Sequence, residues 1–356
     1  MASYTVAGSV ETPGLQRLVE ALQAELERSG FTRALDDRDA ELVLNRVDPV
    51  APRPYRRHAR GTFVAALHER APRPDDVLTA TCPLLVRALA NLVLCYVAPD
   101  EVWFTTMERG TYAVHGADTA QLAARVVERL VPLAQARLVI DNEFCADLEP
   151  ELWGGDELTE EIRRAGVRLG ELELLPAPFP IEELLDERDL RHVRRLYGIG
   201  GLSYGNLSAR KDARRFWMSA SGVDKTHLDV AGRDVLLVSD YDAEMCRIVL
   251  SVPPLLEPRR VSVDAIEHWM IYQAHPGVGA ILHVHAWIDG IPATDVNYPC
   301  GTEELATAVA SLLAEEPNPD EAVIGLRNHG ITATGSSLTE ILDRIEPRVV
   351  RQVPMR

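Results

Sequence analysis

The sequence predicts an α/β protein with two domains, and three observations lead to this prediction. The chain has 356 residues, which exceeds the length of one typical domain. Amphipathic segments typical of helices and short apolar segments typical of strands occur in both halves. The proline-rich segment LLPAPFPIEELL at residues 174–185 interrupts this pattern and marks a boundary. We therefore predict an N-terminal α/β domain over residues 1–175 and a second domain over residues 176–356.

The composition is that of a globular protein with an acidic surface. Hydrophobic residues make up 46% of the chain, charged residues make up 26%, and the net charge is −17 at pH 7. This charge argues against binding to nucleic acid or to an anionic membrane. No segment approaches the roughly 18–20 apolar residues of a membrane span, and the N-terminus lacks the features of a secretory signal. We expect a cytoplasmic protein without nucleic-acid or membrane partners.

The cysteines give a separate indication of the cellular compartment. Five cysteines are scattered along the chain, and none forms a Cys-x-x-Cys pair. This usage predicts reduced thiols and neither a disulfide framework nor a thiolate zinc site.

The N-terminal half contains predicted helices and strands but no motif that assigns a function. Apolar residues from Leu15 to Leu26 fall on one face of a helix that Ser29-Gly30 ends. Asp118 is placed to cap an amphipathic helix that runs to about Val139. This half has no glycine-rich phosphate loop and no cluster of acids or histidines. Its other expected elements are a strand at 40–47, a strand passing into a helix at 61–69, a buried helix at 83–97, and a hairpin at 101–116 that turns at Arg109-Gly110.

The C-terminal half has a different pattern, in which most of the polar motifs lie between predicted strands. Glycines and an asparagine in IGGLSYGNLSAR, residues 199–210, indicate a tight backbone conformation. The other expected elements are a helix containing residues 182–198, strands at 215–220 and 234–240, a helix near 262–275, a strand at 279–287, a helix at 302–316, a strand at 322–327, a turn at 328–330, and a short helix from Leu338.

Two histidines lie two residues apart in the apolar segment GAILHVHAW, residues 279–287. Side chains at this spacing on a strand point to the same face. His283 and His285 are therefore candidates for two ligands of one metal site. A catalytic zinc needs three protein ligands and an open position. The third candidate is His329, which lies in a turn directly after the apolar segment at 322–327. The pattern alone is equally compatible with two core histidines that hydrogen-bond to the backbone.

Asp264 lies at the start of the helix that precedes this strand. Ser262 fits the N-cap position, and a carboxylate in the first turn interacts favourably with the helix dipole. The functional alternative is a general acid/base next to the metal. Glu267 and His268 lie on the same helix, and we interpret His268 as a packing residue or a support for a ligand.

Five motifs that occur in a fixed order resemble those of the class II aldolase/adducin family. This family includes fuculose-phosphate and rhamnulose-phosphate aldolases and ribulose-phosphate 4-epimerases. The resemblance covers about residues 180–356 and implies an α/β/α domain around a mostly antiparallel sheet, in a homo-oligomer that is commonly a tetramer. The motifs are YGNLSAR, SASGVDK, VSVDAIEHWMIYQAHPGVGAILHVHAW, GTEELA and GLRNHGITATG.

The resemblance also implies roles for individual residues. His283, His285 and His329 would bind Zn²⁺, with Fe²⁺ or Mn²⁺ as alternatives. Asp264 falls where the aldolases have a catalytic glutamate and the epimerases an aspartate. Amides in glycine turns and hydroxyl groups can bind an anion without excess positive charge. The residues that resemble the phosphate-holding loops of the family are Gly205, Asn206, Ser221, Gly222 and Ser262.

The chain departs from the family pattern at several positions. Val263 replaces a serine, Ala220 replaces a proline, and Ser219 stands where the epimerases have lysine. A carboxylate or a larger fragment is therefore an alternative to phosphate as the group by which the substrate is held. The segment from Trp287 to Thr302 is short, and it provides no visible second acid/base apart from the phenol of Tyr298.

We predict a metal-dependent lyase of the aldolase type that acts on a small hydroxylated carbonyl compound, such as a sugar phosphate or a related acid. The metal would act as a Lewis acid on the enediolate formed when a C–C bond breaks, and Asp264 would move the proton. Alternatives on the same scaffold are an epimerase, a decarboxylase, a dehydratase or an iron oxygenase. A non-catalytic, adducin-like interaction module is the alternative from another class, and the N-terminal half could recognise a carrier or partner.

Overall fold

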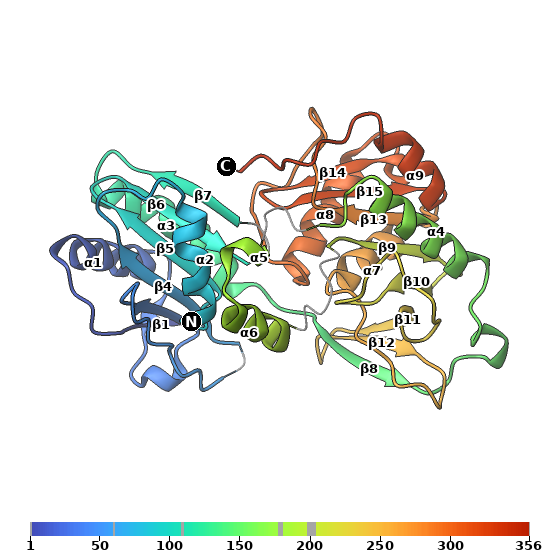
Figure 1. The fold of residues 1–356 in the computed structure, drawn as a ribbon, viewed down its shortest axis with the longest axis horizontal. Coiled ribbons are helices and arrows are strands. Elements are labelled where there is room, and N and C mark those ends of the chain that lie inside the picture. The colour runs from blue at the N-terminus through green and yellow to red at the C-terminus, as the bar shows by residue number, and fades with distance from the viewer. Residues whose placement is uncertain (1, 60, 108–109, 177–180, 198–203, 356) are drawn as a thin grey trace. The chain divides into compact units, whose positions relative to one another are not determined.

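The computed structural model describes residues 2–59, 61–107, 110–176, 181–197 and 204–355, which fall into two compact units (Figure 1). Unit 1 comprises Met1–Gln135, Phe179–Val193 and Met355–Arg356. Unit 2 comprises Ala136–Pro178 and Arg194–Pro354. Residues 136–178 thus group with the C-terminal part of the chain, whereas the domain boundary after residue 175 stays a prediction.

Unit 1 is built around a mostly parallel sheet. Its strands are β1 (Ser3–Ala7), β2 (Thr32–Arg33), β3 (Leu42–Arg46), β4 (Phe63–Glu69), β5 (Leu92–Val97), β6 (Glu101–Thr106) and β7 (Gly110–His115). Their order in the sheet is β2-β1-β3-β4-β5-β6-β7, with parallel pairing from β2 to β5 and antiparallel pairing from β5 to β7. The central strands are buried almost throughout, as in parallel sheets that are covered on both faces.

The helices of unit 1 include a first helix whose N-terminus is already occupied by a carboxylate. They are α1 (Pro13–Arg28), α2 (Val77–Arg87), α3 (Thr119–Gln135), α5 (Ile181–Leu184) and the first part of α6 (Glu187–Tyr197). The Glu69 carboxylate accepts hydrogen bonds from the Thr12 hydroxyl and from the Leu15 amide at the start of α1. The N-terminus of a helix that follows a parallel strand can bind an anion such as phosphate. In this structure the Glu69 carboxylate occupies that position.

Two expectations for the N-terminal half were wrong, for a shared reason. Residues 63–69 form strand β4 without passing into a helix, and the expected helix at 83–97 divides into the end of α2 and strand β5. Strands buried on both faces lack the polar alternation that would distinguish them from buried helices. The first helix, the strand near 40–47 and the hairpin are confirmed, although Arg109 of the turn lies outside the described residues.

The expected cap of the third helix is also confirmed. The Asp118 carboxylate accepts a hydrogen bond from the Gln121 amide, and α3 ends at Gln135, before Val139.

Unit 2 is built around a mostly antiparallel sheet, which confirms the predicted fold class. Its strands are β8 (Asp141–Cys145), β9 (Asn206–Arg210), β10 (Phe216–Ser219), β11 (Val235–Asp242), β12 (Arg247–Ser251), β13 (Ala280–Val284), β14 (Val323–Leu326) and β15 (Gly330–Gly335). The order is β14-β15-β13-β9-β10-β11-β12-β8, and only the β12–β8 pair is parallel among these described strands.

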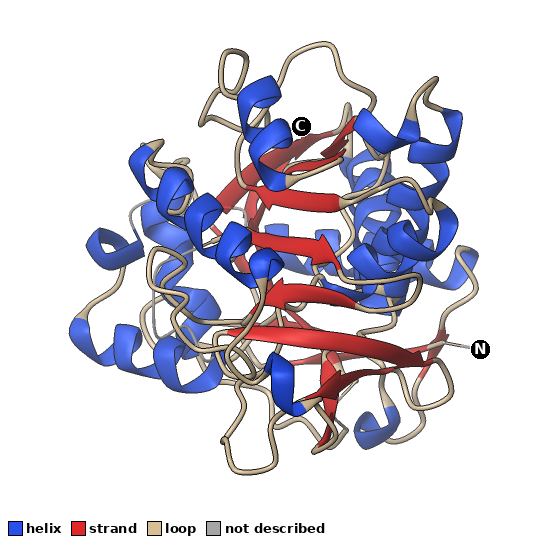
Figure 2. Cartoon of the chain, turned by 90° about the vertical axis from the view of Figure 1, so that its right-hand side faces the viewer, coloured by secondary structure: helices blue, strands red, loops and turns tan. Residues whose placement is uncertain are grey.

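Helices lie on both sides of this sheet (Figure 2). They are α4 (Glu157–Glu171), α7 (Ala265–Ala274), α8 (Glu303–Glu315) and α9 (Leu338–Ile345). Helices α4 and α9 pack against each other and against β9, and α7 packs against α8. None of the helices within the described ranges is both long and apolar enough to cross a membrane.

The expected helix over residues 182–198 is interrupted. The Asp186 carboxylate accepts a hydrogen bond from the Asp189 amide, so a new helix, α6, begins after the short α5. Of the expected tight backbone at 199–210, residues 199–203 lie outside the described part of the chain. Gly205 has a φ of 77°, and residues 206–210 form β9.

Candidate metal centre

The three candidate histidines come together where strand β13 pairs with β15. His283 lies in β13, His285 follows the end of that strand, and His329 precedes β15. The ring centroids are 5.1 Å apart for His283–His285, 4.7 Å for His283–His329 and 4.6 Å for His285–His329. One ring nitrogen from each histidine lies within 4.8 Å of the other two. His283 and His329 are buried, with 1% and 3% of their surface exposed.

The turn between β14 and β15 brings His329 to His285. Asn328, the residue before His329, has a positive φ of 57°, and Gly330 is the residue after His329. A Cβ atom at Gly330 would overlap the Val284 carbonyl group and the His285 backbone, so this close approach requires glycine. The result is a separation of 3.1 Å between the Nε2 atoms of His285 and His329.

The neighbourhood of His283 determines which of its nitrogens can bind a metal. Its Nδ1 lies 3.0 Å from the Ile331 carbonyl oxygen. Because a carbonyl oxygen only accepts, Nδ1 carries the proton and the lone pair lies on Nε2. This backbone contact to the ring nitrogen opposite the ligand is typical of metal-binding histidines. Three convergent imidazoles, two of them almost fully buried, therefore fit a zinc-type ion.

Asp264 is at the N-cap position of α7, but its side chain makes no cap hydrogen bond. Its Oδ2 accepts a hydrogen bond of 2.7 Å from the side-chain amide of Asn206. Its Oδ1 has no hydrogen-bond partner among the described residues. Asn206 in turn lies opposite His283 in the β9–β13 pairing. The expectation that Ser262 is the N-cap was wrong, because the N-cap residue is Asp264 and the helix begins at Ala265.

The predicted substrate-binding residues lie on three backbone segments that are hydrogen-bonded to one another. The Leu207 amide donates to the Ser219 hydroxyl, and the Ser262 amide donates to the Ser219 carbonyl group. The Ser221 backbone amide donates to the Arg260 carbonyl group. Ser221 is exposed. The segments containing Gly205–Asn206, Ser221–Gly222 and Ser262 are thus neighbours, and the Asn206 side chain donates a hydrogen bond to Asp264.

Three further ionisable residues belong to this region and were not predicted as site residues. Glu267 is buried and accepts a 2.5 Å hydrogen bond from the Thr332 hydroxyl, and burial together with the Asp264 carboxylate raises its pKa. Burial lowers the pKa of Lys225 to about 8, although the Asp264 carboxylate acts in the opposite direction. Cys300 Sγ lies 3.3 Å from His329 Nε2.

The sequence contained a weak signal for two of these residues. Lys225 lies in the motif SASGVDK, and Glu267 lies in the motif that begins VSVDAIEH. Neither motif indicates that these side chains are buried, and Cys300 lies in none of the five motifs, so only the folded chain brings the three residues to this region.

His268 behaves as a core residue. It is fully buried, its Nδ1 lies 2.7 Å from the Ser208 hydroxyl, and burial lowers its pKa well below the usual range. This is compatible with the interpretation of His268 as a packing residue.

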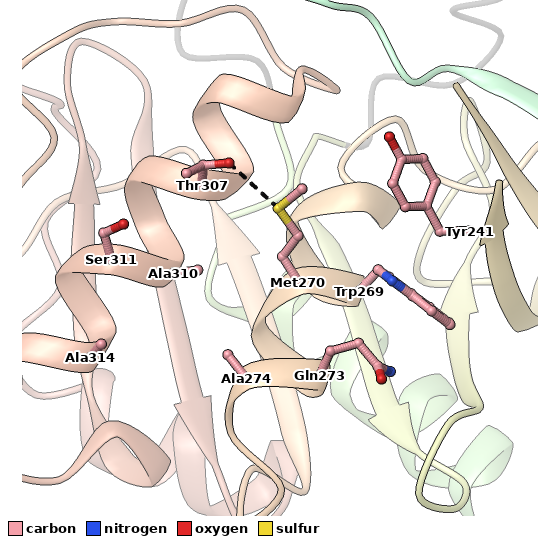
Figure 3. Close-up of a pocket in the computed structure, with 9 residues that line it drawn as sticks. All are labelled: Tyr241, Trp269, Met270, Gln273, Ala274, Thr307, Ala310, Ser311 and Ala314. Atoms are coloured by element: carbon pink, nitrogen blue, oxygen red, sulfur yellow. Dashed lines mark hydrogen bonds between the residues drawn. The ribbon is translucent and has the colours of Figure 1, made fainter. Parts of the chain in front are cut away.

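A separate hollow of about 570 Å³ lies beside α7 (Figure 3). Helices α7 and α8 form its walls, with Tyr241 at one end. None of the candidate site residues lines it, so it is distinct from the histidine cluster. Its lining residues are Tyr241, Trp269, Met270, Gln273, Ala274, Thr307, Ala310, Ser311 and Ala314.

Comparison with known proteins finds a family match within the C-terminal half. Residues 191–288 match the family described as Class II Aldolase and Adducin N-terminal domain. Methylthioribulose-1-phosphate dehydratase of Sodalis glossinidius (strain morsitans) is 32% identical over 82 residues, which are 23% of this chain and 35% of that protein. The matched region thus spans only about a third of this curated relative.

Solved structures of low sequence identity also match part of the chain. L-fuculose 1-phosphate aldolase has 18% identity and a TM-score of 0.36, covering 54% of this chain and 81% of its own. YgbL from Klebsiella pneumoniae, described as a candidate aldolase/epimerase/decarboxylase, has 19% identity and a TM-score of 0.34, covering 54% and 84%.

Proposed function

We propose that this chain is a metal-dependent lyase, and the match of residues 191–288 to the class II aldolase/adducin family supports this proposal. The observation that supports this proposal most strongly is the convergence of His283, His285 and His329 beside the buried Asp264. When bound there, a divalent metal would supply Lewis acidity toward adjacent carbonyl and hydroxyl oxygens of a substrate. Three neutral protein ligands leave positions open for those oxygens.

Asp264 is the proposed proton-transfer group. Its Oδ2 is oriented by the Asn206 amide, while its Oδ1 is the atom without a partner among the described residues. In the cleavage direction, the substrate C–C bond would break, and the hydroxyl group that becomes the new carbonyl would lose its proton. Asp264 would take up a proton from that hydroxyl or from solvent and deliver one to the carbon that keeps the electron pair. In the reverse direction, Asp264 would remove the proton from that carbon and the new hydroxyl group would gain one, so atoms and charge balance in both directions.

Glu267 and Lys225 set the charge around Asp264. The raised pKa of Glu267 favours its protonated form, which avoids two adjacent buried negative charges. Lys225 interacts electrostatically with Asp264. A carboxyl group that stays protonated beside a second carboxyl group is a typical arrangement for acid/base chemistry.

The proposed substrate is a small hydroxylated carbonyl compound held by Gly205, Asn206, Ser221, Gly222 and Ser262. We propose zinc as the metal and a homo-oligomer, with a tetramer expected, as the assembly. Phosphate and carboxylate remain alternative groups by which the substrate is held.

A dehydratase is the second candidate function, because the curated relative is named as one. The same metal and the same Asp264 would then serve loss of water instead of cleavage of a C–C bond. The products distinguish the two reactions, since aldol cleavage gives two carbon fragments and dehydration gives one.

The test of the proposed function is Asp264→Asn in the full-length protein, assayed on a panel of hydroxylated carbonyl compounds with and without phosphate. We expect bound metal to remain and turnover to fall at least about 100-fold, because general acid/base groups typically contribute 10²–10⁴-fold. Asp147→Asn, at an exposed aspartate of unit 2 away from the candidate site residues, is the matched control and should keep turnover. Wild-type rates in Asp264→Asn would contradict the assigned role.

A further inference from the structure

The face of the unit 2 sheet that α7 covers carries a row of three polar side chains. His283 of β13 lies directly opposite Asn206 of β9 and directly opposite Thr332 of β15. Residues that are directly opposite in antiparallel strands have their side chains on the same face of the sheet. The candidate metal ligand His283 therefore lies between a side-chain amide and a hydroxyl group, one on each neighbouring strand.

Two carboxyl groups at the start of α7 bind the two ends of this row. The Asn206 side chain donates a hydrogen bond of 2.7 Å to Asp264, and the Thr332 hydroxyl donates one of 2.5 Å to Glu267. Asp264 and Glu267 are buried, with 6% and 2% of their surface exposed. The N-terminal end of α7 is thus attached to the strands on both sides of β13.

The N-terminal end of α7 depends on such contacts because its usual cap is absent. Asp264 occupies the N-cap position, but its carboxylate is directed at Asn206 and makes no cap hydrogen bond. A helix end without a cap frays unless other contacts hold it. The hydrogen bond between Glu267 and Thr332 supplies such a contact at the third residue of the helix.

This contact reaches the strand that belongs to the third histidine. Thr332 lies in β15, which begins directly after His329. The neighbouring contact, between His268 and the Ser208 hydroxyl, reaches β9 instead. The Glu267–Thr332 pair is therefore the hydrogen bond that joins the turn carrying Asp264 to the strand next to His329.

We propose that Glu267 and Thr332 are positioning residues that hold Asp264 beside the metal centre, an inference that rests on the proposed function. The Thr332 hydroxyl fixes Glu267, Glu267 fixes the first turn of α7, and this turn carries Asp264. A displacement of about 1 Å in a reacting group can lower a rate by up to about 100-fold. Loss of the pair should therefore lower turnover more than it changes substrate affinity.

The alternative role for Glu267 is that of a second proton-transfer group. Such a group needs the carboxyl proton, whereas a positioning group needs only an oxygen that accepts from Thr332. Glutamine keeps this oxygen and is neutral, and burial raises the pKa of Glu267 and favours its neutral form as well. Glu267→Gln therefore separates the two roles.

The test compares Thr332→Val with Thr332→Ser in the full-length protein supplied with zinc. Valine has the shape of threonine without the hydroxyl group, and serine keeps that group. The Glu267 and His268 amides donate to the Asp264 carbonyl group, so their hydrogen–deuterium exchange reports on the first turn of α7. We expect this exchange to be at least about tenfold faster in Thr332→Val.

The kinetic readout is turnover on the panel of hydroxylated carbonyl compounds. We expect Thr332→Val to lower kcat at least about tenfold and to keep KM and zinc content within about twofold of the wild type. Glu267→Leu, which removes the acceptor instead of the donor, is the second disruptive variant and should behave in the same way. Thr332→Ser and Glu267→Gln should stay close to the wild type in exchange, kcat, KM and zinc content.

Thr334→Val is the matched control, because it removes the next hydroxyl on the same face of β15, which donates to the Pro319 carbonyl group. It should keep the exchange in α7 and the kcat of the wild type. A folded Thr332→Val or Glu267→Leu protein with unchanged exchange, or with faster exchange and an unchanged kcat, would overturn the positioning role.

Two further outcomes separate this inference from the proposed function. A Glu267→Gln protein as slow as Asp264→Asn would make Glu267 a proton-transfer group and overturn its positioning role. A wild type that turns over none of the compounds would contradict the proposed function. The exchange rates would then still decide whether Thr332 and Glu267 hold the turn that carries Asp264, because they need no substrate.

Discussion

Asp264 and Glu267 lie within one turn of α7, yet their surroundings differ. Glu267 accepts a hydrogen bond from Thr332, and its buried position raises its pKa. Asp264 accepts from Asn206 and has one carboxylate oxygen without a partner among the described residues. Sequence spacing could place both on the same face of a helix, but only the packing of α7 on the sheet distinguishes a reactive carboxylate from a buried acid.

His68 provides a test of residue-level electrostatics that is independent of the metal site. It is fully buried in β4, neither ring nitrogen has a hydrogen-bond partner among the described residues, and burial lowers its pKa to about 4. Because the unfolded chain binds the proton more readily, the wild type loses stability as the pH falls from about 6.5 to about 4. This cost amounts to about 2 kcal/mol at pH 5.

We therefore predict that His68→Leu, which removes the titratable group, is more stable relative to the wild type at pH 5 than at pH 7.5. Urea unfolding at the two pH values measures this difference, which should be about 2 kcal/mol. An equal difference at both pH values would show that His68 is not held neutral by burial.

At the scale of elements, the β14–β15 turn determines where the third histidine lies. Gly330 approaches the Val284 carbonyl group too closely for any side chain. We predict that Gly330→Ala destabilises unit 2 by about 1–3 kcal/mol and weakens metal binding, because His329 is the adjacent residue. Thermal unfolding and zinc titration measure the two effects.

Gly154→Ala is the appropriate control, since a Cβ atom there meets no other atom within 4 Å. It should leave both quantities near their wild-type values. A Gly330→Ala protein with normal zinc affinity would argue against the role of this turn in forming the site.

The elements also show what the sequence could and could not predict. The pair His283 and His285 was predictable because two-residue spacing on a strand is a local property. Strands β8 and β12 were not predicted, and β5 was mistaken for helix. Strand β5 is buried almost throughout and lacks the alternation of a half-buried strand, and β8 consists mostly of polar residues. Cys300 is 29 residues from His329 in sequence, so its proximity follows only from the folded backbone.

At the scale of the whole molecule, the sheet of unit 2 depends on residues from the first half of the chain. Strand β8 extends the sheet beyond β12, and Ile162, Ala165 and Leu169 of α4 are buried in the core of unit 2. A fragment that begins at residue 177 would lose both elements. Each large buried aliphatic side chain contributes about 2–5 kcal/mol to the free energy of unfolding. The loss of several such side chains together is therefore comparable with the whole stability of a domain.

We predict that a fragment of residues 136–356 folds and binds metal, whereas a fragment of residues 177–356 does not fold. Circular dichroism and size-exclusion chromatography of the two fragments test this. A stable fragment 177–356 that binds metal would instead support the boundary predicted after residue 175.

The central claim is that His283, His285 and His329 hold a metal ion, and one measurement tests it most directly. Plasma mass spectrometry of the untagged full-length protein, purified without chelator, gives the identity and stoichiometry of bound metal. We predict close to one zinc per chain in the wild type and none in His283→Ala. A folded wild type that is free of metal and rejects added zinc, or a His283→Ala protein with full metal content, would contradict the account.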